Sequence, residues 1–171
     1  RRPPRSTLFP YTTLFRSDWK VPDVTQATVH AIFVAAIYDG IARAARDWLV
    51  KFLKERVPAN LGAPLATLPR MQEVAGGIEA RLAVNARLID SFASDFDNGF
   101  PLSAIESNII KLTVTNNAAA VVEDALSLTS NHGLSRTNPL ERHYRDVLCG
   151  RVHTPQDDST RVAAGRFALG V

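Results

Sequence analysis

The residues best suited to chemistry are concentrated in one short segment near the C-terminus, residues 131–156. Three of the four histidines of the chain lie in this segment, together with four arginines, a tyrosine and the single cysteine. The residues concerned are His132, His143, His153, Arg136, Arg142, Arg145, Arg151, Tyr144 and Cys149. Because a solvated helix surface does not require so many titratable groups, we expect a functional site in this segment.

Metal binding and nucleophilic catalysis are the chemistries that this segment supports least. Its histidines are ten or more residues apart, whereas a zinc site on a helix places two ligands one turn apart on one face. Cys149 could act as a nucleophile beside a histidine, but no oxyanion-hole motif accompanies it, and a small buried cysteine is the commoner case. We therefore predict that the chain binds no metal and that Cys149 is structural.

The arginines could instead bind phosphate, because guanidinium groups match phosphate oxygens and a turn at 133–135 would offer backbone N–H donors. The structural alternative is that they pair with neighbouring acidic residues. For Arg145 we favour a pair with Asp146. For Arg136, which lies in a predicted loop, we favour phosphate.

His153 is the residue of greatest interest in the segment. It comes directly before Thr154 and Pro155, at the junction between two predicted helices. A side chain at such a junction can project from a bundle into a neighbouring cavity. Imidazole titrates near neutrality, so a histidine there could give or take a proton. On the residues alone, a structural role is the commoner one for a single histidine.

Helices must position this segment, because apolar residues recur at spacings of three and four along most of the chain. The patterns predict helices at about 24–57, 70–96, 103–129, 139–150 and 155–169. No segment shows the alternation that is typical of a strand. Long helices joined by short loops predict an all-α, up-and-down four-helix bundle.

The first predicted helix carries a well-marked apolar stripe. Its members are Ile32, Phe33, Ala36, Ile37, Ile41, Ala44, Trp48, Phe52 and Leu53. Gly40 and Ala44 lie on the same stripe, and small residues at this spacing let a neighbouring helix approach closely. We therefore expect a close helix crossing at Gly40 and Ala44.

Residues 1–17, RRPPRSTLFPYTTLFRS, differ in composition from the rest of the chain. The run is rich in arginine and has no acidic residue, so it could be a basic arm for nucleic acid or membrane, or a transit peptide. Its back-translation, however, resembles a common sequencing adapter without a gap. We therefore expect 1–17 to be a non-native, disordered leader, and 18–171 to be one helical-bundle domain.

Excluding this leader changes the charge of the chain. Four of the 20 basic residues, Arg1, Arg2, Arg5 and Arg16, belong to it, so 16 basic and 17 acidic residues remain and the net charge falls from +3 to −1. Nothing global then favours nucleic acid as a partner. No uninterrupted apolar run reaches the roughly 18 residues of a membrane span. The single cysteine fits a reducing compartment, so we expect a cytoplasmic protein.

Several segments resemble the C-terminal domain of acyl-CoA dehydrogenase-like flavoproteins. They are LERHYRDVLCGRVHTPQDD with GLSRTNP before it, IYDGIARAARDWLVKFLKERVP, and LGAPLATLPRMQ. The resemblance extends over essentially all of 18–171 and is greatest to the flavin monooxygenase branch, which includes dibenzothiophene monooxygenases and sulfur-acquisition oxidoreductases. It implies that this bundle follows a helical domain and a β-domain in the full-length enzyme, and that a flavin, FMN or FAD, lies between the β-domain and the bundle.

The resemblance also implies roles for particular residues. A histidine matching His153 lies near the reactive edge of the flavin and protonates or hydrogen-bonds the oxygen adduct of the reduced cofactor. Arg56, Ser135 and Arg136 match regions that approach the flavin phosphate. Acyl-CoA dehydrogenases often carry a glutamate base in a Tyr-Glu-Gly-Thr motif here, where this chain has the residues 151–154, Arg-Val-His-Thr. This difference disfavours dehydrogenation of an acyl-CoA.

We therefore expect the C-terminal part of a reduced-flavin-dependent monooxygenase that acts on a small organic substrate, with organosulfur compounds among the candidates. The family implies a homotetramer and a flavin reductase as partner, and we expect the chain alone to be inactive. One alternative is an acyl-CoA dehydrogenase proper, in which an acyl-CoA reduces the flavin without a reductase. Another is a non-enzymatic helical module that packs against a partner through the stripe at Gly40 and Ala44.

Overall fold

The computed structural model describes residues 23–101 and 103–171, which form helices and loops without a strand. The predicted leader, 1–17, lies outside the described residues. The long helices are α2 (Val24–Glu55), α3 (Pro69–Asp97) and α4 (Ala104–Thr129). Shorter elements are η2 (Leu65–Thr67), α5 (Asn131–Leu134), α6 (Leu140–Leu148), η3 (Cys149–Arg151) and α7 (Asp157–Leu169).

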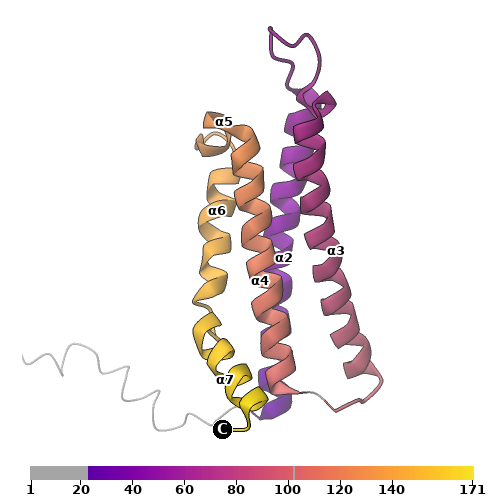
Figure 1. Cartoon of the computed structure of the whole chain (residues 1–171), viewed down its shortest axis with the longest axis vertical. Helices are drawn as coiled ribbons and strands as arrows, with labels where there is room; N and C mark the ends of the chain where they lie inside the picture. Colours follow the sequence, from indigo (N-terminus) through magenta and orange to yellow (C-terminus); the bar gives the residue numbers. More distant parts are fainter. Residues whose placement is uncertain (1–22, 102) are drawn as a thin grey trace, which may run out of the picture.

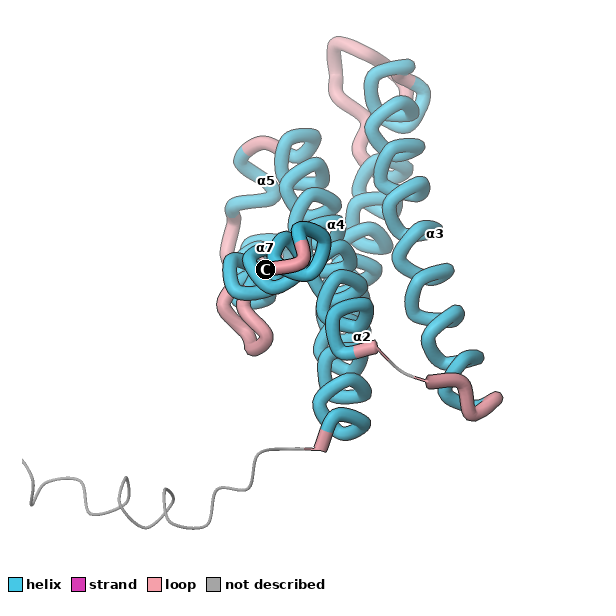
Figure 2. The backbone as a smooth tube through the Cα atoms, turned by 60° about the horizontal axis from the view of Figure 1, so that its bottom comes forward, coloured by secondary structure: helices cyan, strands magenta, loops and turns pink. Residues whose placement is uncertain are grey.

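The helices run up, down, up and down, as predicted (Figure 1). α2 and α4 run in the same direction and share the most extensive helix contact in the bundle. α3 packs along one side of this pair, and α6 and α7 pack along the other. The fourth position of the bundle is therefore filled by a broken rod, α6–η3–α7, and the tube view shows the loops that interrupt it (Figure 2).

Local signals fix several helix ends. The side chain of Asp23 accepts a hydrogen bond from the backbone N–H of Gln26 at 2.9 Å, and Ser103 accepts one from the N–H of Glu106 at 3.3 Å. These bonds satisfy N–H groups that have no partner within the helix. Pro69 occupies the first turn of α3, where its missing N–H costs nothing.

Alanine closes the seam between α2 and α4. Ala31, Ala35, Ala42 and Ala45 of α2, and Ala118, Ala119 and Ala125 of α4, are fully buried. Larger side chains, among them Leu49, Ile78 and Leu82, fill the core around this seam. The short alanine side chains let the two helices approach closely, which explains the extent of their contact.

The predicted inner stripe of α2 was wrong in its phase. Phe33 and Ile37 are 66% and 59% exposed, and Gly40 and Ala44 also lie on the outer surface. A Cβ atom added at Gly40 would meet nothing within 4 Å, so no helix crosses there. α2 is apolar on two faces, and the sequence pattern favoured the face with the larger side chains.

A buried polar network joins α2, α3 and α4. The side-chain amide of Asn85, which is fully buried, donates to Asp39 Oδ1 at 2.9 Å and accepts from Asn117 Nδ2 at 2.9 Å. Arg43 Nε donates to the second carboxylate oxygen of Asp39 at 2.6 Å. Buried polar groups are costly unless partnered, so this network is compatible with only one register of the three helices.

α2 is, among the described residues, the one helix long and apolar enough to cross a membrane. It also carries Asp39 on its buried face, paired with Arg43, and packs along α4 over much of its length. Core helices of globular bundles meet the same length and composition criteria. The apolar residues on the inner face of α2 are therefore accounted for by its place in the bundle, whereas Phe33 and Ile37 on its outer face are exposed.

Candidate functional site

His153 lies against the middle of α2, at the break between η3 and α7. Its Nδ1 is 3.2 Å from the hydroxyl oxygen of Tyr38, and the two rings meet edge to face with centroids 6.0 Å apart. The ring of His30, two turns earlier on α2, lies 6.2 Å from that of His153. His153 is itself exposed, so the structure presents it at the surface, as its position between two helices predicted.

The hydroxyl of Tyr38 can donate a hydrogen bond to Nδ1 of His153 or accept one from it. Burial, reinforced by the nearby Cys149 and Asp146, raises the pKa of the Tyr38 phenol above 10.0, so the hydroxyl keeps its proton at neutral pH. A phenol that donates to Nδ1 leaves a neutral imidazole with its proton on Nε2. In this arrangement His153 presents an N–H donor away from α2, suited to a developing negative charge on an oxygen.

A glycine lets the η3 turn approach the bundle closely enough for this contact. A Cβ atom at Gly150 would lie 3.1 Å from Thr115 Cβ and 3.3 Å from Tyr38 Cγ. The backbone of η3 therefore lies directly on α2 and α4. The backbone N–H groups of Val152 and His153 both donate to the Cys149 carbonyl, at 3.2 and 3.0 Å, and fold the chain back at this point.

The other predicted site residues lie at the far end of the bundle. Arg56 follows the last residue of α2, and Ser135 and Arg136 follow α5. The rings of Phe52 and His132, 5.3 Å apart, bring these two helix ends together. Arg56 is 18 residues beyond Tyr38, which is about 27 Å along a helix axis. The predicted residues therefore form two separate groups, and the structure does not bring them into one pocket.

The group at the far end offers hydrogen-bond donors on an ordered loop. Arg56 and Arg136 are exposed, and the hydroxyls of Ser135 and Thr137 lie 2.8 Å apart. Asn138 Nδ2 donates to the carbonyl of His132 at 2.7 Å and holds the loop against α5. Two exposed guanidinium groups and a hydroxyl fit the phosphate that the sequence resemblance implies.

Two predictions for the polar segment need correction. Arg145 does form a structural ion pair, but its partner is Glu141, one turn earlier, at 3.1 and 3.2 Å, rather than Asp146. A residue next in sequence points to another side of the helix, whereas one four residues away lies on the same side. Cys149, expected to be buried, is exposed. Among the described residues, no group of His, Cys, Asp and Glu could hold a metal ion.

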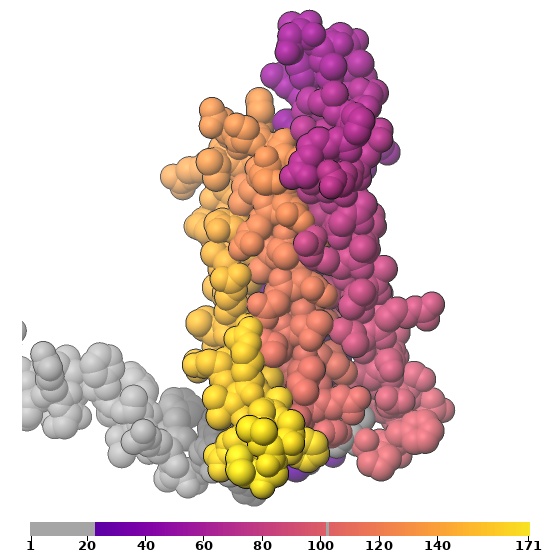
Figure 3. All heavy atoms as spheres, in the orientation of Figure 1, coloured from indigo at the N-terminus to yellow at the C-terminus, as the bar shows by residue number. Residues whose placement is uncertain are grey.

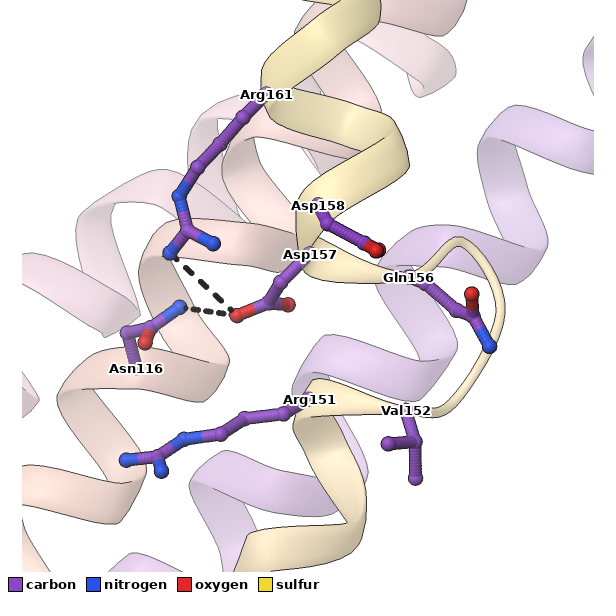
Figure 4. A pocket seen from close by; sticks show the side chains of 7 residues that line it. All are labelled: Asn116, Arg151, Val152, Gln156, Asp157, Asp158 and Arg161. Atoms are coloured by element: carbon purple, nitrogen blue, oxygen red, sulfur yellow. Dashed lines mark hydrogen bonds and ion pairs between the residues drawn. The ribbon is translucent and has the colours of Figure 1, made fainter.

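A groove lies behind the His153 segment, between α4, η3 and α7. It has a volume of about 460 Å³. Its lining includes Arg151, Arg161 and the paired Asp157, to which both Asn116 and Arg161 point (Figure 4). Because charges of both signs line it, the groove has no marked preference for an anion or a cation.

Sequence reasoning missed three residues of this region. Tyr38 and His30 lie in a helix whose pattern indicated packing, and nothing in their spacing connects them with a histidine more than a hundred residues later. Lys111 is fully buried in α4 and contacts the His153 segment. A lysine on the inner face of an apolar helix is a signal that could have been noticed, because lysine is almost never fully buried unless it is paired.

The fold and the site together define an all-α bundle with a histidine displayed at its surface. The chain belongs to the acyl-CoA dehydrogenase family, since residues 23–158 match the family's model "Acyl-CoA dehydrogenase, C-terminal domain". Members of this family are flavin-dependent oxidoreductases that bind FAD.

Individual relatives agree with this assignment. YdbM of Bacillus subtilis, named for the acyl-CoA dehydrogenases, is 36% identical over 140 residues, which cover 80% of this chain and 37% of YdbM. Amino sugar nitrososynthase of Streptomyces peucetius is 31% identical over 148 residues, which cover 81% of this chain and 36% of the nitrososynthase. The structure of butyryl-CoA dehydrogenase from Megasphaera elsdenii has the same fold, with a TM-score of 0.78 at 23% identity over 85% of this chain and 37% of that one. The chain thus spans little more than a third of the length of these proteins.

Proposed function

We propose that this chain is the C-terminal bundle of a reduced-flavin-dependent monooxygenase, in which His153 donates a proton or hydrogen bond at the reactive edge of the flavin. The observation that carries the proposal is the His153–Tyr38 pair. With the phenol as the donor, the pair presents an imidazole N–H at the surface of the bundle, at the place where dehydrogenases of this family often carry a carboxylate base. Residues 151–154 contain no acidic side chain.

The chemistry of the site favours oxygen transfer over dehydrogenation. Removing an α-proton from an acyl-CoA requires a general base, and acyl-CoA dehydrogenases often use a glutamate for this step. The nearest acidic residue after His153 in sequence is Asp157, which is buried and engaged by Asn116 and Lys111. Flavin, when bound, supplies the redox chemistry, while the chain's own residues hold and move protons beside it. The similarity to an amino sugar nitrososynthase supports placing this chain in a branch of the family that does not carry out dehydrogenation.

The two groups of predicted residues serve different parts of the assembly in this proposal. We assign His153 to the flavin ring, and Arg56, Ser135 and Arg136 to flavin phosphate. Their separation of about 27 Å along α2 favours contacts with two flavin molecules, as in a homotetramer whose flavins lie partly against neighbouring subunits. We further propose a cytoplasmic enzyme that receives reduced flavin from a reductase, acts on a small organic substrate, and requires its upstream domains for activity.

The decisive experiment uses the protein that carries this bundle together with its upstream domains. We expect reduced flavin and oxygen to support substrate oxidation, and His153→Ala to lower turnover by about 10²-fold or more, as loss of a general acid does. His143→Ala, which changes a histidine of α6, is the matched control. Wild-type turnover in His153→Ala would refute the role of His153.

Dehydrogenation is the second candidate, and the similarity to YdbM favours it. It predicts that an acyl-CoA bleaches the bound flavin under anaerobic conditions without a reductase. Anaerobic titration with acyl-CoAs of several chain lengths distinguishes the candidates, because the monooxygenase proposal expects no bleaching by any of them.

A further inference from the structure

Lys111 is a buried titratable group to which the proposed chemistry assigns no role. Its side chain is completely inaccessible to solvent, and it extends from α4 into the break between η3 and α7. Desolvation lowers the pKa of its ammonium group below 10.5, an effect that the charge and hydrogen bond of Asp157 oppose. A lysine in such a place is unfavourable unless all its donors are used.

All three donors of the ammonium group have an acceptor. Lys111 Nζ is 2.6 Å from the carbonyl oxygen of Gly150, 2.9 Å from that of Pro155 and 3.4 Å from Asp157 Oδ1. Gly150 lies three residues before His153, and Pro155 lies two residues after it. One ammonium group therefore holds both ends of the short segment that carries His153.

The broken rod explains why a charged donor is needed here. A helix leaves the carbonyl groups of its last turn without partners, and the carbonyls of Gly150 and Pro155 are oriented toward the interior of the bundle. The carboxylate of Asp157, in the first turn of α7, is held on its other oxygen by Asn116 Nδ2 at 2.8 Å (Figure 4). Both Lys111 and Asn116 belong to α4, so this helix fixes the end of η3 and the start of α7 together.

We propose that Lys111, with Asp157, is the positioning residue that holds His153 against Tyr38. This inference rests on the proposed role of His153, because holding His153 in place matters for function only if His153 itself takes part in the reaction. Residues 151–154 are exposed, and the side chain of Arg151 pairs with Glu123 of α4 at 3.6 Å. Without the ammonium group, the segment would lose its hydrogen bonds from α4 to the carbonyls of Gly150 and Pro155. His153 would keep its side-chain contact with Tyr38 and the bond of its backbone N–H to Cys149.

The test uses the 171-residue chain and needs no flavin. Lys111→Met keeps the length of the side chain but removes its donors. We expect amide hydrogen exchange at Val152 and His153 to become about tenfold faster or more relative to amides in α3, because charge-assisted hydrogen bonds are lost. The nuclear Overhauser contact between the rings of Tyr38 and His153 should disappear. Lys111→Gln, which keeps two donors, should restore part of both signals.

Val122→Ala is the matched control. It removes fully buried volume from α4, two turns beyond Thr115, without touching the His153 segment. It should lower global stability and leave the ring contact and the relative exchange at His153 unchanged. If Lys111→Met behaves like this control, Lys111 only supports the core and the proposal is overturned.

A second variant decides the matter if Lys111→Met does not fold. Asp157→Asn removes the negative charge, keeps a similar shape, and should raise exchange at His153 in the same direction by a smaller factor. Unchanged exchange at His153 in a folded Asp157→Asn chain would equally overturn the proposal. A failure of the proposed function would give a different result. Amide exchange at His153 would still become faster in Lys111→Met, but His153→Ala would retain wild-type turnover in the longer protein.

Discussion

At the scale of single residues, the hydroxyl of Tyr38 is the atom on which the tautomer of His153 depends. Tyr38→Phe removes the donor and leaves Nδ1 facing an apolar ring edge. We expect a loss of about 1 kcal/mol or less in the free energy of unfolding, measured by urea denaturation. The loss should be non-additive with His153→Ala, because the two residues share one interaction. Full additivity in the double variant would show that the pair is not coupled.

His143 makes the stability of the bundle depend on pH. Burial, followed by the positive charge of Arg142, lowers the pKa of this imidazole below 6.5, with Asp146 opposing. The unfolded chain then binds a proton at a pH where the folded chain does not. Stability contributed by the neutral imidazole is complete above 6.5 and is lost as the pH falls through 6.5 toward the folded-state pKa.

His143→Gln should therefore flatten the stability profile on the acidic side. The measurement is urea denaturation of both chains at several pH values between about 5 and 8. Equal slopes for the wild type and the variant over this interval would contradict the assignment.

At the scale of elements, two glycines in different packing environments are predicted to respond in opposite directions when changed to alanine. Gly150→Ala places a methyl group 3.1 Å from Thr115 Cβ, and overpacking of this kind costs about 1–3 kcal/mol. Gly40→Ala fills open space on the outer face of α2 and should stabilise the helix by about 0.5–1 kcal/mol. Thermal unfolding of the two variants checks both signs, and a stable Gly150→Ala chain would mean that η3 does not lie against α4.

Elements differ in how far the sequence predicts them. The long apolar patterns were sufficient to predict all the long helices. The inner faces of α2 and α4 were not predictable in the same way. α2 is apolar on two faces, and α4 is contacted by α2, α3, α6 and α7, so its buried residues occupy most of its circumference. Periodicity identifies a face only where the opposite face is polar.

The surroundings of the candidate site could be predicted only in part. His153 was proposed because it lies at a helix junction in a segment rich in titratable groups, and the structure places it at that junction. Tyr38 and Lys111 contact that segment from helices far away in sequence, and only the packing of the bundle brings them together. Gly133 was predicted as part of a turn, but the packing that requires a glycine there was not: a Cβ would collide with Thr129 and Leu140.

At the scale of the whole molecule, the outer face of α2 is a large apolar surface on a bundle that, in its relatives, is only part of a longer chain. Phe33 and Ile37 are the central residues of this surface. We expect the isolated chain to self-associate through it, because exposed apolar patches promote association. The double change Phe33→Glu and Ile37→Glu should shift sedimentation toward monomer without loss of helical circular dichroism.

Val84→Glu is the control for this prediction. Val84 is also a large exposed hydrophobic residue, but it lies on α3. It should leave the association state unchanged. Equal dissociation by both changes would mean that the effect comes from added charge alone.

The space-filling view shows α4 with α3 on one side and the broken rod on the other (Figure 3). Behind it, the seam with α2 is closed by seven fully buried alanines. No smaller side chain than alanine is available except glycine, and any larger one would separate the two helices. The seam thus restricts how the protein can evolve. Descendants with new substrates would acquire their changes on the outer faces and in the loops, while these alanines would persist as an invariant signature.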